Sequence, residues 1–218
     1  TATDSARYSG RADGIVSWWR AEGNARDSIL QFPAAVVGAS YAIGVTPERQ
    51  AFNFDGIDDY IDTFYNYAFH LSTAVTLEAW VYPTSNQVGV IVGQTNGFEI
   101  HTLDDGRLRF FLSGTAQLNS VSALPLNTWS HVAGTFANGI VSIYINGVLN
   151  ASATTGGSMI INANPVQIGG FNVSGVANTG YFAGSIDEVA IYNRALVNDE
   201  ISRFVTQGGQ SHHGTYGG

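Results

Sequence analysis

Apolar and polar residues alternate over short segments along most of the chain, and Gly, Asn, Pro and Asp separate the segments. In the clearest segment, 75–82, every second residue is aliphatic, and Pro83 ends the run. A period of two is typical of strands with one buried face, so the pattern predicts antiparallel β-structure. Further segments of this kind are 88–92, 98–103, 107–112, 129–136, 140–145, 148–153, 166–169 and 181–192.

Tight turns are predicted where an Asx-Gly pair separates two of these segments. The pairs are Asp105-Gly106, Asn138-Gly139 and Asn146-Gly147. Residues of these types accept the positive φ angles that short hairpin turns require. We therefore expect consecutive segments to fold as hairpins.

One short helix is predicted near the C-terminal end, where Asn198, Asp199 and Glu200 precede apolar residues and Gly208-Gly209 follows. About a dozen strands and one helix indicate an all-β fold, an antiparallel β-sandwich or jelly roll. We expect one domain over residues 14–206, between an N-terminal tail (1–13) and a Gly/His-rich C-terminal tail (207–218).

Composition narrows the function classes. The 218 residues carry a net charge of −8, and every basic residue is arginine. An acidic surface without clustered positive charge argues against a nucleic-acid partner. The chain has no cysteine, which excludes disulfides and zinc–thiolate sites, and no apolar run reaches the ~20 residues of a membrane span. The polar residues Thr1 to Ser5 would fit a mature N-terminus after signal cleavage.

Five stretches together resemble the laminin G-like, concanavalin A-like domain family. They are IVSWW (15–19) with Asp27, AFNFDG (51–56) with DDYI (58–61), TLEAWVYP (76–83), the run from Trp129 to Gly147, and the run from Phe182 to Leu196. The resemblance covers residues 14–204 and implies a concanavalin A-like jelly roll. Where the family has a helix-capping serine, this chain has Val197, so Asn198 is expected to cap the helix.

The resemblance also implies a structural calcium ion, held by a carboxylate of the last long strand and oxygens near the N-terminal strand. Asp187 and Asp27 match those places. Calcium prefers six to eight oxygen ligands, which a carboxylate and turn carbonyls can supply. In the alternative interpretation, both aspartates only accept backbone N–H bonds.

A ligand site is expected in the loops that the pentraxin branch of the fold uses. Where that branch has calcium-binding carboxylates, this chain has amides and aromatic rings, which suit a sugar. The candidate residues are Gln94, Asn96, Phe171, Asn172, Asn178 and Tyr181. The alternative is an ordinary solvated loop.

Catalysis is not expected. Glycoside hydrolysis needs two carboxylates across the sugar bond, and no strand carries alternating acids. Glu78 and Glu99 are isolated, and Glu188 is expected to point away from Asp187. The aspartates at 55, 58, 59 and 62 look like a metal-binding loop, but they lack the full acidic pattern and closing glutamate of an EF-hand, and strand alternation would separate Asp58 from Asp59. The favoured interpretation is a turn at Asp55-Gly56 followed by solvated or hydrogen-bonded aspartates.

The sequence therefore predicts a non-catalytic, secreted or cell-surface binding module whose partner is a glycan or cell-surface polysaccharide. The alternative is a structural subunit that assembles with copies of itself through its tails or sheet edges into a surface layer or filament.

Overall fold

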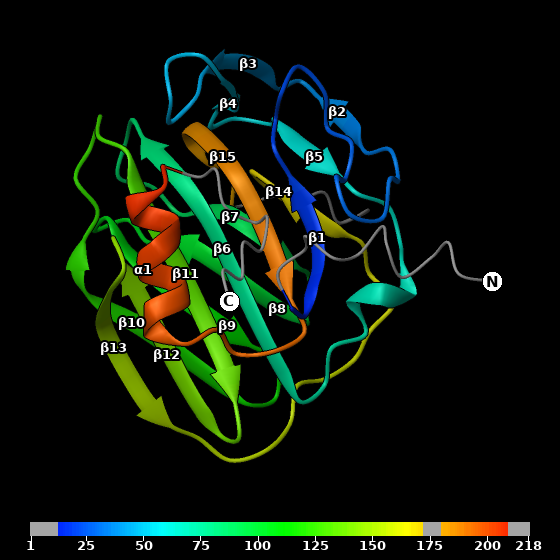
Figure 1. Cartoon of the computed structure of the whole chain (residues 1–218), viewed down its shortest axis with the longest axis vertical. Helices are drawn as coiled ribbons and strands as arrows, with labels where there is room; N and C mark the ends of the chain where they lie inside the picture. The colour runs from blue at the N-terminus through cyan, green and yellow to red at the C-terminus, as the bar shows by residue number, and fades with distance from the viewer. Residues whose placement is uncertain (1–12, 172–179, 209–218) are drawn as a thin grey trace, which may run out of the picture.

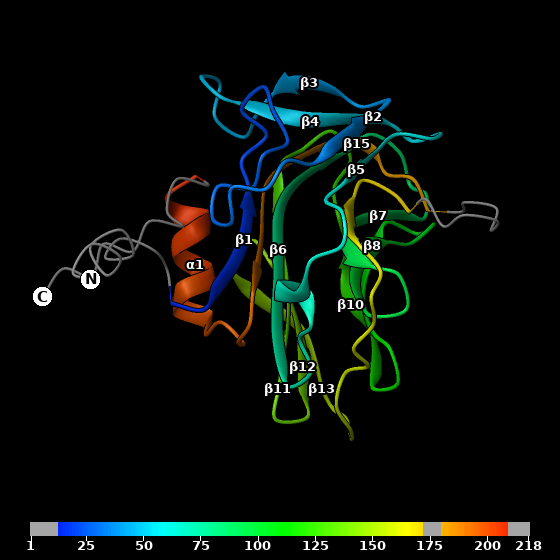
Figure 2. The ribbon, with the colours of Figure 1, turned by 90° about the vertical axis from the view of Figure 1, so that its right-hand side faces the viewer.

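Two antiparallel sheets face each other in the computed structural model, which describes residues 13–171 and 180–208 (Figures 1 and 2). The first sheet runs in the order β13 (Val148–Thr154), β12 (Ile140–Ile145), β11 (Ser130–Ala137), β6 (Ala74–Pro83), β15 (Ala183–Tyr192), β4 (Gln50–Asp55) and β3 (Ser40–Ile43), and β1 (Ile15–Trp19) also pairs with β15. The second runs β10 (Ala116–Ala123), β9 (Arg107–Leu112), β8 (Phe98–Thr102), β7 (Gly89–Gln94), β14 (Val166–Ile168), β5 (Tyr60–Asp62) and β2 (Ala35–Val37).

The all-β prediction is confirmed, and so are the predicted hairpins. Asn138-Gly139 joins β11 to β12, and Asn146-Gly147 joins β12 to β13, with positive φ at all four residues. That geometry matches the twist of the flanking strands. Fifteen strands lie in the described residues rather than about twelve, because β2, β3 and β10 were not expected.

The main core lies between the sheets. It is built from the inward-facing residues of both sheets, and Phe52, Leu77, Phe110, Phe136 and Ile191 are among its fully or almost fully buried members. Gly134 in β11 leaves room for the ring of Phe110 in β9, since a Cβ at residue 134 would lie 2.7 Å from that ring. This contact fixes how closely the two sheets approach.

Helix α1 (Asn198–Thr206) covers the outer face of the first sheet (Figure 2). Its Ile201 and Phe204 pack with Trp18 and Tyr192 in a second apolar cluster, which explains why the outward-facing Trp18 is buried. The expected Asn198 cap is wrong. Val197 precedes the first helical residue, and the carboxylate of Glu200 accepts its N–H at 3.0 Å.

No helix in the two described ranges is long and apolar enough to cross a membrane. Both predicted tails lie almost entirely outside the described residues, so the idea that they contact neighbouring copies stays a prediction.

Candidate functional site

Asp187 lies in β15 and is fully buried. Its Oδ2 accepts the Val45 N–H at 3.0 Å and its Oδ1 accepts the Glu188 N–H at 2.8 Å. Burial raises the pKa of this carboxyl to about 6, although the two N–H bonds oppose the shift. The carboxylate is therefore a structural acceptor that ties the residue 45 loop to the sheet.

Asp27 is also buried, and its Oδ1 accepts the N–H groups of Trp18 at 3.0 Å and Ile29 at 2.8 Å. Strand β1 separates it from Asp187, since Trp19 pairs with Asp27 on one side and with Val189 on the other. Neighbouring strands lie about 4.8 Å apart, so roughly two strand spacings divide the two backbones. The hydrogen bonds fit the interpretation of both aspartates as backbone acceptors, and a calcium ion held by the pair stays a prediction.

Glu188 does not point away from Asp187 in the way that strand alternation predicts. A β-bulge between Asp187 and Ala190, with a φ of +51° at Glu188, breaks the alternation. The Glu188 carboxylate accepts a hydrogen bond from the Trp18 Nε1–H at 2.5 Å. It also forms an ion pair with the Arg49 guanidinium, at an N–O distance of 2.9 Å. Burial and the charge of Asp187 raise its pKa to about 8.

Of the six residues predicted to bind a ligand, Gln94 ends β7 and Asn96 lies in the turn that follows it. Gln94 is buried and its Nε2 donates to the Asn164 carbonyl at 2.7 Å, whereas Asn96 is exposed in the β7–β8 turn. Gly180, next to Tyr181, bonds instead to Val90, near the other end of β7. Four residues of strand separate these ends by roughly 13 Å.

The ligand site predicted from the six residues stays a prediction. Phe171 and Tyr181 are half-buried at the edges of the undescribed segment, and Asn172 and Asn178 lie outside the described residues.

An acidic cluster stands on the loop before β5. Carboxylate oxygens of Asp55, Asp58 and Asp59 lie within 4.8 Å of one another, which strand alternation does not predict, because the strand begins only at Tyr60. Asp59 accepts the Asp55 N–H at 2.9 Å and Asp55 accepts the Ile57 N–H at 2.8 Å. These bonds are the turn chemistry expected of aspartate.

An aromatic segment that the sequence patterns did not single out follows β5. It comprises Phe64, Tyr65, Tyr67 and His70, around the short 3-10 helix η2 (Tyr67–Phe69). The rings of Tyr65, Tyr67 and His70 are all in mutual contact, with centroids 5.1–5.8 Å apart. The sequence does place three aromatic residues, Phe64, Tyr65 and Tyr67, within four positions. Because a loop has no regular hydrophobic period, the sequence does not indicate whether their side chains face the core or the solvent.

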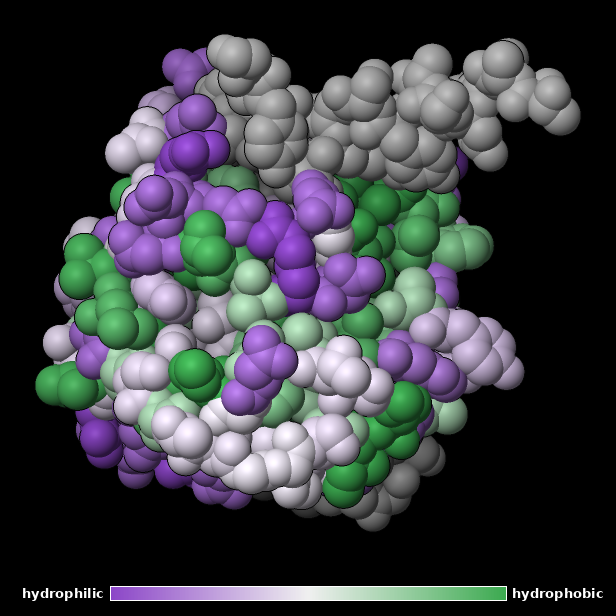
Figure 3. Space-filling model, turned by 60° about the horizontal axis from the view of Figure 1, so that its bottom comes forward, coloured by the Kyte–Doolittle hydropathy of each residue, from purple (hydrophilic) through white to green (hydrophobic). Residues whose placement is uncertain are grey.

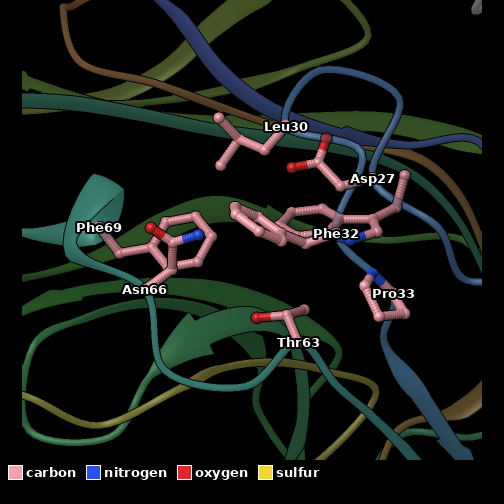
Figure 4. Close-up of a pocket in the computed structure, with 8 residues that line it drawn as sticks. Asp27, Leu30, Phe32, Pro33, Thr63, Asn66 and Phe69 are labelled. Carbon is pink, nitrogen blue, oxygen red and sulfur yellow. The ribbon is translucent and has the colours of Figure 1, made fainter.

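A small cavity, which we call the slot, lies beside this segment (Figure 4). Its volume is about 10 Å³, enough for about one water molecule. One wall carries Phe32 and Pro33, and the other carries Thr63 and Asn66. The rest of the lining consists of Trp19, Asp27, Leu30 and Phe69. The slot therefore joins a loop of the N-terminal region to the start of the aromatic segment.

Much of the molecular surface carries little charge, as the 12% content of charged residues predicts. Figure 3 shows one such face, on which strongly hydrophilic residues form a band while much of the remainder is pale or green.

A jelly roll with this strand order defines the class of two-sheet, lectin-like β-sandwich domains. The chain belongs to the concanavalin A-like lectin/glucanases superfamily, whose laminin G-type family model matches residues 55–202. The resemblance seen in the sequence is thereby confirmed. A search of curated proteins finds no match.

Solved structures share the fold at low sequence identity. Domain 4 of AbnA, a GH43 extracellular arabinanase from Geobacillus stearothermophilus in complex with arabinotriose, is 22% identical with a TM-score of 0.69; the match covers 88% of this chain and 98% of that domain. The binding domain of Paraclostridial Mosquitocidal Protein 1 is 20% identical with a TM-score of 0.68, over 89% of this chain and 52% of that one.

A mutant Trypanosoma rangeli sialidase displaying trans-sialidase activity is 19% identical with a TM-score of 0.69, over 90% of this chain. The match covers only 33% of the sialidase, so the chain spans about a third of that enzyme and about half of the mosquitocidal binding domain. At these identities the likeness concerns the fold alone.

Proposed function

We propose that the protein is a non-catalytic, extracellular module that binds saccharides. The observation that carries the proposal is the match to 98% of one separate domain, domain 4 of an extracellular arabinanase, which was solved with arabinotriose. Because this chain matches almost the whole of a domain that was solved with a sugar, the elements of this fold alone are enough to form a sugar-binding surface. The function itself must come from the surface residues, since one fold serves many functions.

The contacts of three glutamates, Glu78, Glu99 and Glu188, support a binding role. Glu188 is engaged by Trp18 and Arg49, the Glu99 carboxylate lies 2.9 Å from His101, and the buried Glu78 carboxylate lies 3.3 Å from His131. Hydrolysis of a glycosidic bond requires two carboxyl groups about 5–9.5 Å apart that face the same sugar. These side chains serve the sheet instead.

The structural calcium ion remains a prediction within this proposal, and no step of binding is assigned to it. Asp187 and Asp27, whose backbones lie on opposite sides of β1, are the residues predicted to hold it. Melting curves after EDTA treatment, with and without added CaCl₂, test the prediction. We expect calcium to raise the Tm of the wild-type protein and not that of Asp187→Asn. Identical wild-type curves with and without calcium would contradict the prediction of a bound ion.

Affinity gel electrophoresis tests the proposed function. Gels cast with arabinan, xylan, mannan or β-glucan should retard the protein, and the same polysaccharides should release no reducing sugar during long incubation. Migration unchanged in every gel would refute saccharide binding. Retardation together with reducing-sugar release would show an enzyme instead.

A further inference from the structure

We propose that the aromatic segment, together with Phe32 across the slot, is the surface on which this protein stacks neutral sugar rings. The inference rests on the proposed function and gives it a location. It differs from the loops around Gln94 and Tyr181 that sequence analysis favours.

The first observation is the exposure of large aromatic side chains. Tyr67 is 75% exposed, and Phe64 and Phe32 are each 52% exposed. Single exposed apolar residues are common, but exposed rings that contact one another, as those of Tyr65, Tyr67 and His70 do, mark a candidate interaction site. An aromatic face can stack on the C–H face of a sugar ring, so these side chains have a chemical use at the surface.

The rings are already oriented before any ligand arrives. Tyr67 meets both Tyr65 and His70 edge to face, with interplanar angles of 66° and 67°. The Tyr65 hydroxyl and His70 Nε2 lie 3.2 Å apart, within hydrogen-bond distance. A surface whose side chains are fixed in advance loses less conformational entropy on binding.

The backbone on both walls of the slot is held in a costly conformation. Phe64 has a φ of +59°, and Gln31, next to Phe32, has a φ of +62°. The left-handed conformation costs a side-chain-bearing residue about 1–2 kcal/mol. Such strain persists where neighbours enforce it, and it clusters at ligand sites.

The enforcing contacts at Phe64 come from the two residues before it. The Asp62 carboxylate accepts the Phe64 N–H at 2.8 Å, and the Thr63 hydroxyl donates to the Val166 carbonyl at 2.8 Å. On the far side, Asn66 accepts the Ala68 N–H at 2.9 Å and begins η2. These bonds hold the exposed rings outward from a rigid sheet.

The chemistry of the surroundings selects the ligand class. The Asp62 carboxylate, which accepts the Phe64 N–H, lies beside the surface and disfavours an anionic polymer, whereas hydroxyl and imidazole groups at the ring edges suit sugar hydroxyls. Beyond Pro33, a shallow hollow of about 350 Å³ is lined by Asn24, Arg26 and Gln31, among others. It offers room for the next units of a chain.

A protein partner is disfavoured by size. A stable protein interface buries about 800 Å² on each partner and involves 20–30 residues a side. The aromatic segment and Phe32 provide five side chains, which suits one or two sugar rings.

The test compares variants of the full chain by isothermal titration calorimetry with the neutral polysaccharide that retards it most. Tyr67→Ala is expected to weaken binding roughly tenfold, the effect of losing one good contact. Phe32→Ala, on the opposite wall, should weaken it several-fold, and Tyr67→Trp should restore it. Val121→Ala is the matched control, because Val121 is 77% exposed on β10 and should leave affinity unchanged.

The outcomes separate the two proposals. Alginate, an anionic polysaccharide, should bind at least tenfold more weakly than the neutral ligand, and equal binding would contradict the ligand class. If the wild-type protein binds and both Tyr67→Ala and Phe32→Ala bind equally well with unchanged Tm, the location is wrong while saccharide binding stands. If the wild-type protein binds no polysaccharide in the panel, both proposals fall.

Discussion

At the scale of single residues, the bulge at Asp187 and Glu188 places two adjacent buried carboxyl groups in the first sheet. Arg49 lies 2.9 Å from Glu188 and 3.7 Å from Glu22, so one guanidinium serves at least two acids. Burial outweighs this pairing at Glu188, whose pKa stays raised. A buried pair of this kind gives less stability than its Coulomb attraction suggests, because both groups lose their hydration.

This arrangement predicts a loss of stability as pH rises. The pKa of Glu188 is about 8 when folded and 4.5 ordinarily, so its stabilising contribution is full below about pH 4.5 and is lost as pH rises towards 8. Asp187 acts in the same direction up to about pH 6. Melting curves in EDTA should therefore show a Tm that falls between pH 5 and pH 8. For a chain of this size, each kcal/mol lost from the free energy of unfolding lowers Tm by roughly 2–4 °C.

Two variants check whether Glu188 causes the pH dependence. In Glu188→Gln, Tm should fall less between pH 5 and pH 8 than in the wild-type protein. Glu200→Gln is the control: pairing with Arg194 lowers the pKa of Glu200, so its contribution is lost only as pH falls below about 4.5. A wild-type Tm that is constant, or that rises, across this range would contradict the raised pKa values.

Sequence reasoning at this scale succeeded where a residue serves the fold and failed where geometry is local. Asp55 was interpreted as a turn residue, and its carboxylate does cap a turn. Glu188 was misplaced because a bulge leaves no mark in a two-residue pattern. Phe32 and Asn66 meet across the slot although 34 positions separate them, and no periodicity reports such a contact.

At the scale of elements, Gly134 decides how β11 lies against β9. A Cβ there would stand 2.7 Å from the Phe110 ring in a fully packed core. Gly134→Ala should therefore destabilise the protein by about 1–3 kcal/mol, the usual cost of overpacking. Urea unfolding measures the change.

Gly156→Ala is the matched control for that substitution, because a Cβ at residue 156 has open space around it. It should be neutral or slightly stabilising. Equal unfolding midpoints for the two variants would show that the sheets do not meet closely at Phe110.

Strands were predictable where one face is aliphatic and were missed where the buried residues are polar or few. Strand β6 alternates throughout and was found. Strand β10 was missed because a buried residue in it is Ser120, whose hydroxyl accepts the Leu108 N–H at 2.9 Å. Strands β2 and β3 have three and four residues, too few for a period to stand out.

The open edges of the two sheets bear on the self-assembly alternative. Asn150 in β13 accepts the N–H groups of Val121 and Ser122 in β10, at 2.7 and 3.2 Å. This side chain satisfies edge donors that would otherwise be available to another chain. Assembly through that side of the sandwich is therefore disfavoured, and light scattering of the wild-type protein should show no concentration-dependent growth through it.

At the scale of the whole molecule, the sandwich provides a rigid frame and the loops provide the chemistry. The family match and the shared fold explain why the architecture could be predicted from ordered motifs spread along the chain. The proposed location of binding could not, because Phe32 and the aromatic segment lie in separate loops that meet at the slot, and no sequence pattern reports that contact.

The most direct test is a ¹H–¹⁵N NMR titration of the ¹⁵N-labelled full chain. The ligand is an oligosaccharide of the polysaccharide that retards the protein most in the affinity gels. If sugars bind at the aromatic segment and Phe32, saturable shifts are expected to concentrate in residues 30–33 and 63–70, with no comparable change in α1 or β13. Saturable shifts confined to other regions, or a spectrum that stays the same at millimolar sugar, would contradict it.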